Sequence, residues 1–103
     1  VVFLINENDQ SSDEFQLMQM KSDFNITLVG DTTSGTNGVA ASYLIQENVL
    51  TYFSKDAVTY PTGSPFQRLG LAPDIPVELT IAGVRNRKDE VLIRAIEFAK
   101  SGK

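Results

Sequence analysis

Two short apolar runs constrain the fold of this chain more than any other feature: residues 1–5 (VVFLI) and residues 26–29 (ITLV). Such runs, rich in β-branched residues, suit strands that are buried on both faces, as in a parallel sheet. Polar, turn-forming residues follow the first run, and residues 13–21 then place apolar side chains at a spacing that fits a short helix. Strand, helix and strand in this order predict a βαβ unit with a right-handed crossover.

The pattern changes after residue 40. The sequence predicts a hairpin whose strands are residues 41–45 and 49–54, joined at QEN (residues 46–48). It also predicts a strand at residues 57–60 and a turn at PTGSP (residues 61–65). Two prolines in LGLAPDIPVEL limit any strand there to a short or edge strand. Residues 88–100 form the clearest amphipathic helix, with Gly102 as its stop signal. The predicted fold class is therefore α/β, with a βαβ start, then antiparallel strands, then a C-terminal helix.

Composition excludes several classes of function. The chain has 103 residues, enough for one domain, and contains neither cysteine nor histidine. Disulfides, thiolate metal sites and His₂ metal sites are therefore excluded, and we expect no metal and no other cofactor. A net charge of −4 without a Lys/Arg run argues against nucleic acid and anionic membrane surfaces as partners. No stretch approaches the ~20 apolar residues that span a bilayer.

The chain opens directly on a strand-like run, which is unusual for a natural N-terminus. We expect that an upstream portion precedes it and carries any targeting segment.

Ser11, in the stretch INENDQSSDEF (residues 5–15), has two interpretations. Ser11 and Glu14 satisfy the S-x-x-E capping box, which stabilises a helix by about 1 kcal/mol and needs no chemistry. Alternatively, Ser11 is a nucleophile at the carboxyl end of a sheet, and the helix amides beginning with Ser12 stabilise an oxyanion. A serine needs a neighbour that takes its proton. Since the chain has no histidine, that base would be one of its lysines or a group from elsewhere.

The stretch GDTTSGTNG (residues 30–38) is a loop by composition. Gly30 and Gly35 have the spacing of a phosphate-binding loop, but Thr36 and Asn37 replace the lysine and hydroxyl residue that such loops require. Nucleotide binding is therefore not expected. The loop is either a mobile glycine loop or one that lines a substrate site.

Four stretches, taken in order, resemble the C-terminal processing (tail-specific) serine peptidases, and in particular their branch from Bacteroides-like bacteria: VVFLINENDQSSDEF, ITLVGDTTSGTNG, YPTGSPFQRLGLAPDIPVEL and DEVLIRAIEFAK. The resemblance runs over nearly the whole chain. It implies a ClpP/crotonase-like fold, with residues 1–103 as the C-terminal part of a catalytic domain. It also implies peptides or unfolded proteins as substrates and a periplasmic or cell-envelope location.

Matched to the motifs of that family, Ser11 would be the nucleophile that forms an acyl-enzyme, and Glu14 the acid that follows it. The amide of Ser12 would supply one oxyanion donor, and Gly35 and Thr36 would lie in the loop that lines the substrate.

The sequence departs from the family at two positions. Thr36 stands where the best-known members carry a lysine base. A second branch, similar to the tricorn peptidase, uses an upstream histidine and a glutamate, and the nearest match to that glutamate is Gln67. The resemblance therefore implies a base from the upstream part, and an isolated chain that is weak or inactive.

Two other functions remain open: a non-catalytic module that holds extended peptides, and a purely structural α/β domain. Whatever its function, a chain with exposed strand edges would tend to pair with a second copy of itself.

Overall fold

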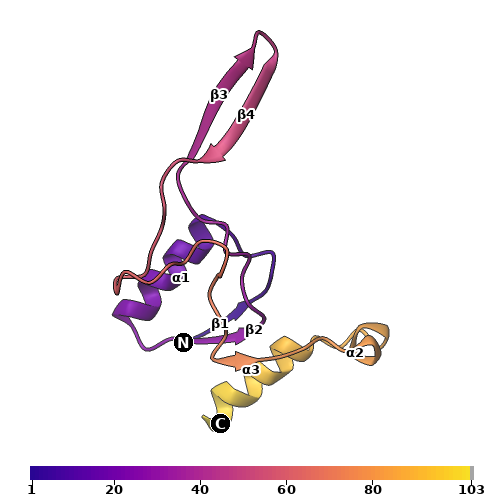
Figure 1. Cartoon of the computed structure of the whole chain (residues 1–103). Helices are drawn as coiled ribbons and strands as arrows, with labels where there is room; N and C mark the ends of the chain where they lie inside the picture. The colour runs from indigo at the N-terminus through magenta and orange to yellow at the C-terminus, as the bar shows by residue number, and fades with distance from the viewer. Residues whose placement is uncertain (103) are drawn as a thin grey trace.

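The computed structural model of the chain describes residues 1–102. Its elements follow in this order: β1 (Val2–Ile5), α1 (Ser12–Asp23), β2 (Thr27–Gly30), β3 (Ala40–Gln46), β4 (Val49–Ser54), β5 (Ile75–Pro76), α2 (Ile81–Arg85) and α3 (Glu90–Ser101) (Figure 1). β1, β2 and β5 form a parallel sheet in the order β1-β2-β5, in which Leu4 lies opposite Val29 and Val29 opposite Ile75. The predicted βαβ unit is confirmed.

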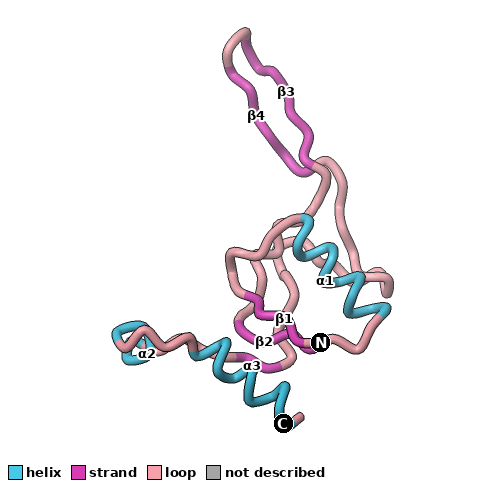
Figure 2. The backbone as a smooth tube through the Cα atoms, turned by 180° about the vertical axis from the view of Figure 1, so that it is seen from behind, coloured by secondary structure: helices cyan, strands magenta, loops and turns pink. Residues whose placement is uncertain are grey.

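The sheet lies between α1 and α3, as Figures 1 and 2 show from opposite sides. The apolar core fills the α1 face and combines residues of α1, the strands and a later loop: Ile5, Leu17, Met18, Ile26, Leu28, Phe66 and Leu71. α3 packs against β1 and β2 and buries Ala95. The carboxyl ends of β1 and β2 are thereby held side by side, and the turn that follows β1 leads to Ser11.

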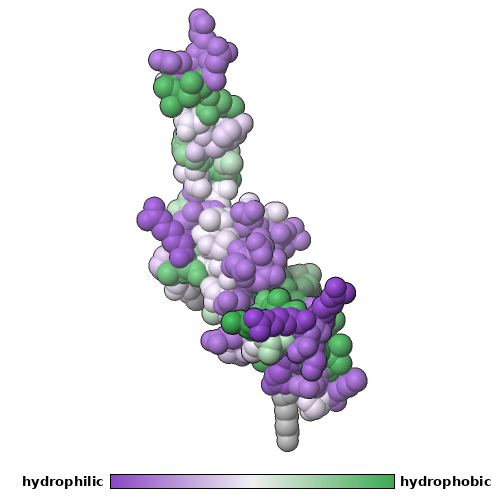
Figure 3. All heavy atoms as spheres, turned by 90° about the vertical axis from the view of Figure 1, so that its right-hand side faces the viewer, coloured by the Kyte–Doolittle hydropathy of each residue, from purple (hydrophilic) through white to green (hydrophobic). Residues whose placement is uncertain are grey.

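β3 and β4 form an antiparallel hairpin that projects from the rest of the chain (Figures 1 and 2). The hairpin exposes large apolar side chains, including Tyr43 (64%) and Tyr52 (71%). The Cα radius of gyration is 17.0 Å, whereas a compact chain of this length has about 13 Å. In Figure 3 the hairpin forms a narrow column in which apolar and polar patches alternate below a hydrophilic tip.

Most of the elements expected from the sequence are present, including the hairpin, the turn at PTGSP and the C-terminal helix. Gly102 ends α3 with a left-handed backbone (φ 71°), as expected of a stop signal. The strand predicted for residues 57–60 is wrong, because only Thr59 forms an isolated bridge, to Pro65. Proline has no N–H with which to extend such a ladder.

α2 is a short helix that the sequence pattern did not predict. Thr80 caps it by accepting a hydrogen bond from the amide of Gly83 at 2.9 Å. The carboxylate of Glu90 in turn accepts from the Thr80 amide and hydroxyl, and these hydrogen bonds lower the pKa of Glu90. None of the helices within residues 1–102 is long and apolar enough to cross a membrane.

Candidate active site

Ser11 lies at the N-cap of α1, in the connection from β1, and its side chain is exposed. Its backbone has φ 57° and ψ −115°, whereas an ordinary N-cap residue is extended. Ser11 and Glu14 keep the arrangement of a capping box, but the Ser11 hydroxyl forms no hydrogen bond with the geometry of a cap. The strained backbone thus presents this hydroxyl to solvent beside the first turn of a helix.

Two acceptors hold the backbone of Ser11 in this conformation. Its amide donates to the carbonyl oxygen of Thr36 at 2.9 Å and to Oε2 of Glu14 at 3.2 Å. A non-glycine residue at positive φ costs about 1–3 kcal/mol and persists only where the surroundings impose it. Here the surroundings are the first turn of α1 and the loop of residues 31–38.

Glu14 is fully buried although it carries a carboxylate. Its Oε1 accepts from the hydroxyl of Thr33 at 2.5 Å and from the amide of Gly35 at 2.7 Å. Thr33 Oγ1 also accepts from the amide of Leu71 at 2.8 Å. These donors are all uncharged, so hydrogen bonds rather than an ion pair offset the cost of burying the carboxylate. Glu14 therefore ties α1 to the loop of residues 31–38 and, through Thr33, to the segment around Leu71.

Gly35 and Gly70 let these two segments approach backbone to backbone. Gly35 has φ +67°, and a Cβ there would lie 2.7 Å from the amide nitrogen of Gly70. Gly70 has φ +73°, and a Cβ there would lie 2.4 Å from the carbonyl oxygen of Thr33. The glycine loop is thus held firmly beside Ser11, whereas the sequence left open that it was mobile.

The side chains at positions 36 and 67 are neutral. Thr36 is exposed, and its Oγ1 lies 2.7 Å from Oγ of Ser34. The side-chain oxygen of Gln67 accepts the amide hydrogen of Asn37 at 3.2 Å, which joins two loops. Neither side chain can take a proton from Ser11.

Asn37 carries a buried donor that has no acceptor. Its Oδ1 accepts from the amide of Gly38 at 2.8 Å, which fixes the orientation of the side chain. Nδ2 is left without a hydrogen-bond partner. A buried unpaired donor of this kind costs about 1–3 kcal/mol in lost hydration.

Tyr60 lies beside Phe66 and Gly70. Its ring meets that of Phe66 edge-on with centroids 5.5 Å apart, and its hydroxyl donates to the carbonyl oxygen of Gly70 at 3.2 Å. Burial raises the pKa of Tyr60, and the nearby charge of Glu14 raises it further. Tyr60 is therefore neutral at physiological pH and acts as a hydrogen-bond donor.

The lysines of the described residues make no hydrogen bond with Ser11. Lys21 binds Asp74 at 2.6 Å. Lys55 lines an open hollow of about 510 Å³ with Gln67 and Arg68, and Ser11 is not among the residues that line it. Across residues 1–102 there is also no group of three or more carboxylate, imidazole or thiol side chains that could hold a metal ion.

The structure brings together the residues singled out from the sequence. Ser12 is the first residue of α1, where no carbonyl of the helix can accept its amide hydrogen. Gly35 and Thr36 lie in the loop that contacts Ser11 through the Thr36 carbonyl. Sequence reasoning missed the buried anchor that Glu14 forms with Thr33, because a capping box gives no sign that its glutamate also binds a distant loop.

Known structures of low sequence identity share this fold. A protein from Parabacteroides merdae that has been proposed to be a peptidase matches 94% of this chain with TM-score 0.83 and 23% identity. Mature CPAF matches 93% with TM-score 0.81 and 19% identity, and a lipoprotein from Streptococcus agalactiae matches 90% with TM-score 0.60 and 17% identity. The chain covers 30%, 19% and 31% of these three proteins, respectively, so it spans less than a third of each.

The comparison with curated proteins found no match. The sequence profile of peptidase family S41 matches residues 1–77, which include Ser11, the glycine loop and most of the core. The chain therefore belongs to peptidase family S41.

Proposed function

We propose that this chain supplies the nucleophile of a serine endopeptidase of the tail-specific, C-terminal processing type. The observation that carries the proposal is the backbone of Ser11, whose positive φ is held by Thr36 and Glu14 while its hydroxyl stays exposed. Strained backbone at a strand-to-helix turn is a recurring way to present a serine nucleophile.

In the proposed reaction, Oγ of Ser11 attacks the carbonyl carbon of the scissile peptide bond, and a general base takes the hydroxyl proton. The oxyanion of the tetrahedral intermediate accepts a hydrogen bond from the amide of Ser12, with support from the positive end of α1. Collapse of the intermediate breaks the C–N bond, and the amine leaves with the proton from the base. Water then hydrolyses the ester on Ser11 and releases the second product.

The general base is proposed to come from outside residues 1–103. Thr36 and Gln67 are neutral, and the chain contains no histidine. An isolated chain would then lack one member of the nucleophile–base pair, which costs several orders of magnitude in rate. The natural setting is a longer protein, in keeping with the small share of each structural relative that the chain covers.

The proposal is tested in the native protein that carries this chain. A fluorophosphonate probe should label Ser11 in the wild type and leave the Ser11→Ala variant unlabelled, as read by peptide mass spectrometry. Hydrolysis of an unstructured protein should fall by at least about three orders of magnitude in Ser11→Ala, while Ser22→Ala, a change at an exposed serine of the same helix, retains full activity. Unchanged hydrolysis by a folded Ser11→Ala variant would falsify the proposal.

The second candidate is a module that binds peptides without cleaving them. The neutral residues at positions 36 and 67 favour it, because neither Thr36 nor Gln67 supplies the ionisable side chain that a catalytic peptidase would carry there. Peptide binding without probe labelling at Ser11, in the presence of the whole protein, would support this candidate over the peptidase.

Two further parts of the proposal concern partners and location. The exposed edges of β3 and β4 are proposed to pair with a second copy of the chain. A periplasmic or cell-envelope location rests on the resemblance to tail-specific peptidases, and cell fractionation tests it.

A further inference from the structure

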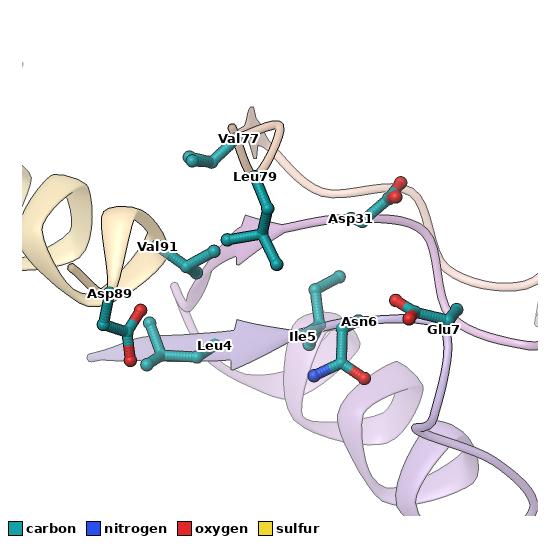
Figure 4. Close-up of a pocket in the computed structure, with 9 residues that line it drawn as sticks. All are labelled: Leu4, Ile5, Asn6, Glu7, Asp31, Val77, Leu79, Asp89 and Val91. Carbon is teal, nitrogen blue, oxygen red and sulfur yellow. The ribbon is translucent and has the colours of Figure 1, made fainter. Parts of the chain in front are cut away.

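A groove of about 350 Å³ lies at the carboxyl ends of β1 and β2, next to the start of α3 (Figure 4). Its apolar lining consists mainly of four aliphatic side chains, Leu4, Val77, Leu79 and Val91, whereas the adjoining Ile5 is 1% exposed and belongs to the core. Figure 4 shows these side chains gathered between β1 and the segment that follows β5. A lining of this kind fits an aliphatic side chain of a ligand.

Carboxylates stand at both ends of the groove. Asp89 lies at the end beside α3, while Glu7 and Asp31 lie at the other end, where β1 and β2 finish (Figure 4). Asp31 and Asp89 accept hydrogen bonds from main-chain amides, at 2.6 Å and 2.9 Å, and neither hydrogen bond comes from a cation. None of the residues that line the groove is basic. The charge at the rim is therefore negative at neutral pH.

The groove and Ser11 share one edge of the parallel sheet. Glu7 belongs to the turn that runs from β1 to Ser11, a turn closed by a hydrogen bond from the amide of Asp9 to the carbonyl of Asn6 at 3.0 Å. Asp31 is the first residue of the loop of residues 31–38. In that loop, the carbonyl oxygen of Thr36 accepts a hydrogen bond from the Ser11 amide. Both segments that position Ser11 thus also form one end of the groove.

We propose that this groove is a specificity site that takes an aliphatic side chain flanked by lysine or arginine in an extended peptide. The inference rests on the proposed peptidase function and names a class of substrate for it. The aliphatic side chain fills the groove, and the flanking cations approach Asp89 at one end and Glu7 with Asp31 at the other. Charge complementarity selects this occupant over an acidic or neutral segment.

The test measures binding apart from cleavage. Fluorescent nonapeptides, identical except for a central Lys-Leu-Lys, Glu-Leu-Glu or Lys-Ser-Lys, are titrated by fluorescence anisotropy into the Ser11→Ala form of the native protein. We expect the Lys-Leu-Lys peptide to bind most tightly and its affinity to fall with added salt. The double variant Glu7→Gln/Asp31→Asn should lower the affinity for the Lys-Leu-Lys peptide by up to about fivefold per carboxylate, the limit for an exposed ion pair.

One further rim variant and one control complete the series. Asp89→Asn removes a rim charge yet keeps a residue that caps a helix well, so a loss of affinity there does not reflect a disrupted α3. Glu47→Gln removes an exposed charge at the hairpin tip, outside the groove, and should leave affinity unchanged. Thermal melts confirm that each variant is folded.

The outcomes separate the two proposals. Equal affinity for the three peptides, or an affinity that the rim variants leave unchanged, overturns the groove assignment whether or not Ser11 is catalytic. Selective binding of the Lys-Leu-Lys peptide that the rim variants weaken supports the groove. If the fluorophosphonate probe then fails to label Ser11 of the wild-type protein, the peptidase assignment is wrong and the groove remains as a peptide-binding site.

Discussion

The carboxylate of Glu14 accepts the amide hydrogen of Gly35 at 2.7 Å, although both residues are buried and lie 21 positions apart in the chain. The same carboxylate binds the Ser11 amide through its other oxygen. One side chain therefore links the helix that begins at Ser11 to the loop that lies beside it. The stability of the fold and the geometry of the candidate nucleophile depend on the same group.

Replacing Glu14 should lower the free energy of unfolding, and the loss should grow with the number of hydrogen-bond donors that are left unpaired. Glu14→Gln keeps the volume but places an NH₂ group against one of the donors, and we expect a loss of about 1.5–3 kcal/mol in the free energy of unfolding. Glu14→Ala leaves the Thr33 hydroxyl and the Gly35 amide without that acceptor and opens a cavity, so about 3–5 kcal/mol is expected. Urea denaturation measures both variants. Equal, small losses below about 0.5 kcal/mol would show that the buried network contributes little.

The backbone of Ser11 predicts a difference between two substitutions that both remove the hydroxyl. Glycine tolerates φ 57° with ψ −115° far better than alanine. Ser11→Gly should therefore be more stable than Ser11→Ala by about 1 kcal/mol or more. Both should be inactive if Ser11 is the nucleophile. Thermal and urea denaturation of the two proteins, measured side by side, check the order, and a more stable alanine variant contradicts the strained conformation.

The order of elements could be read from the sequence because short apolar runs and turn residues are local signals. Residues 1–5 and 26–29 could be predicted as strands, because short apolar runs rich in β-branched residues suit the strands of a buried parallel sheet. β5 is only two residues long, Ile75–Pro76, and a strand this short carries no pattern of its own. α2 was missed for a related reason, because its stability depends on contacts between Thr80 and Glu90, ten positions apart.

The candidate site could be predicted only in part. Ser11, Ser12 and the loop of residues 30–38 were recognisable from spacing and glycine content. The role of Thr33 was not, because a buried threonine that bridges Glu14 and Leu71 looks in the sequence like any loop threonine. Hydrogen-bond networks of this kind join residues far apart in the chain, so no periodic pattern in the sequence reveals them.

Gly35 should not tolerate a side chain. A Cβ there would lie 2.7 Å from the Gly70 nitrogen, and its φ of +67° disfavours alanine independently. Gly35→Ala should lower the free energy of unfolding by about 2 kcal/mol or more. Gly63→Ala is the matched control, because Gly63 also has a positive φ (+83°) but has open space around it. Similar losses in the two variants would mean that backbone strain, and not the contact with Gly70, sets the cost.

The projecting hairpin predicts self-association of the chain. Leu44 pairs with Leu50, and Tyr52 lies on the same face of the hairpin. Because burial of each large apolar side chain contributes about 1.5–3 kcal/mol, the double variant Leu44→Lys/Tyr52→Lys should weaken a hairpin-mediated dimer by at least about two orders of magnitude. Sedimentation velocity over a range of concentrations measures this. Gln46→Lys adds charge at the hairpin tip and serves as control, and a wild-type chain that stays monomeric at high concentration rules out the association.

Asp74 should contribute to the loss of folding stability at acid pH. Partial burial opposes ionisation of Asp74, but hydrogen bonds from Lys21 and the Leu28 amide outweigh it, so its pKa lies below the ordinary value of 3.8. Because the folded-state pKa is lowered, this contribution is fully present above the unfolded-state pKa and is lost as the pH falls through the folded-state pKa, that is, below about pH 4. Asp74→Asn keeps an acceptor for the Leu28 amide and loses only the ion pair.

The Lys21–Asp74 pair is exposed, at 38% and 40%, so Asp74→Asn should cost no more than about 1 kcal/mol at pH 7. The difference in stability between the wild type and this variant should shrink as the pH falls through the lowered folded-state pKa of Asp74, because the wild-type carboxylate then becomes protonated. Urea denaturation at pH 7, 5, 4 and 3 measures it, with Asp56→Asn as the control for loss of one exposed carboxylate. A difference that stays constant down to pH 3 would show that Asp74 does not stabilise the fold through its charge.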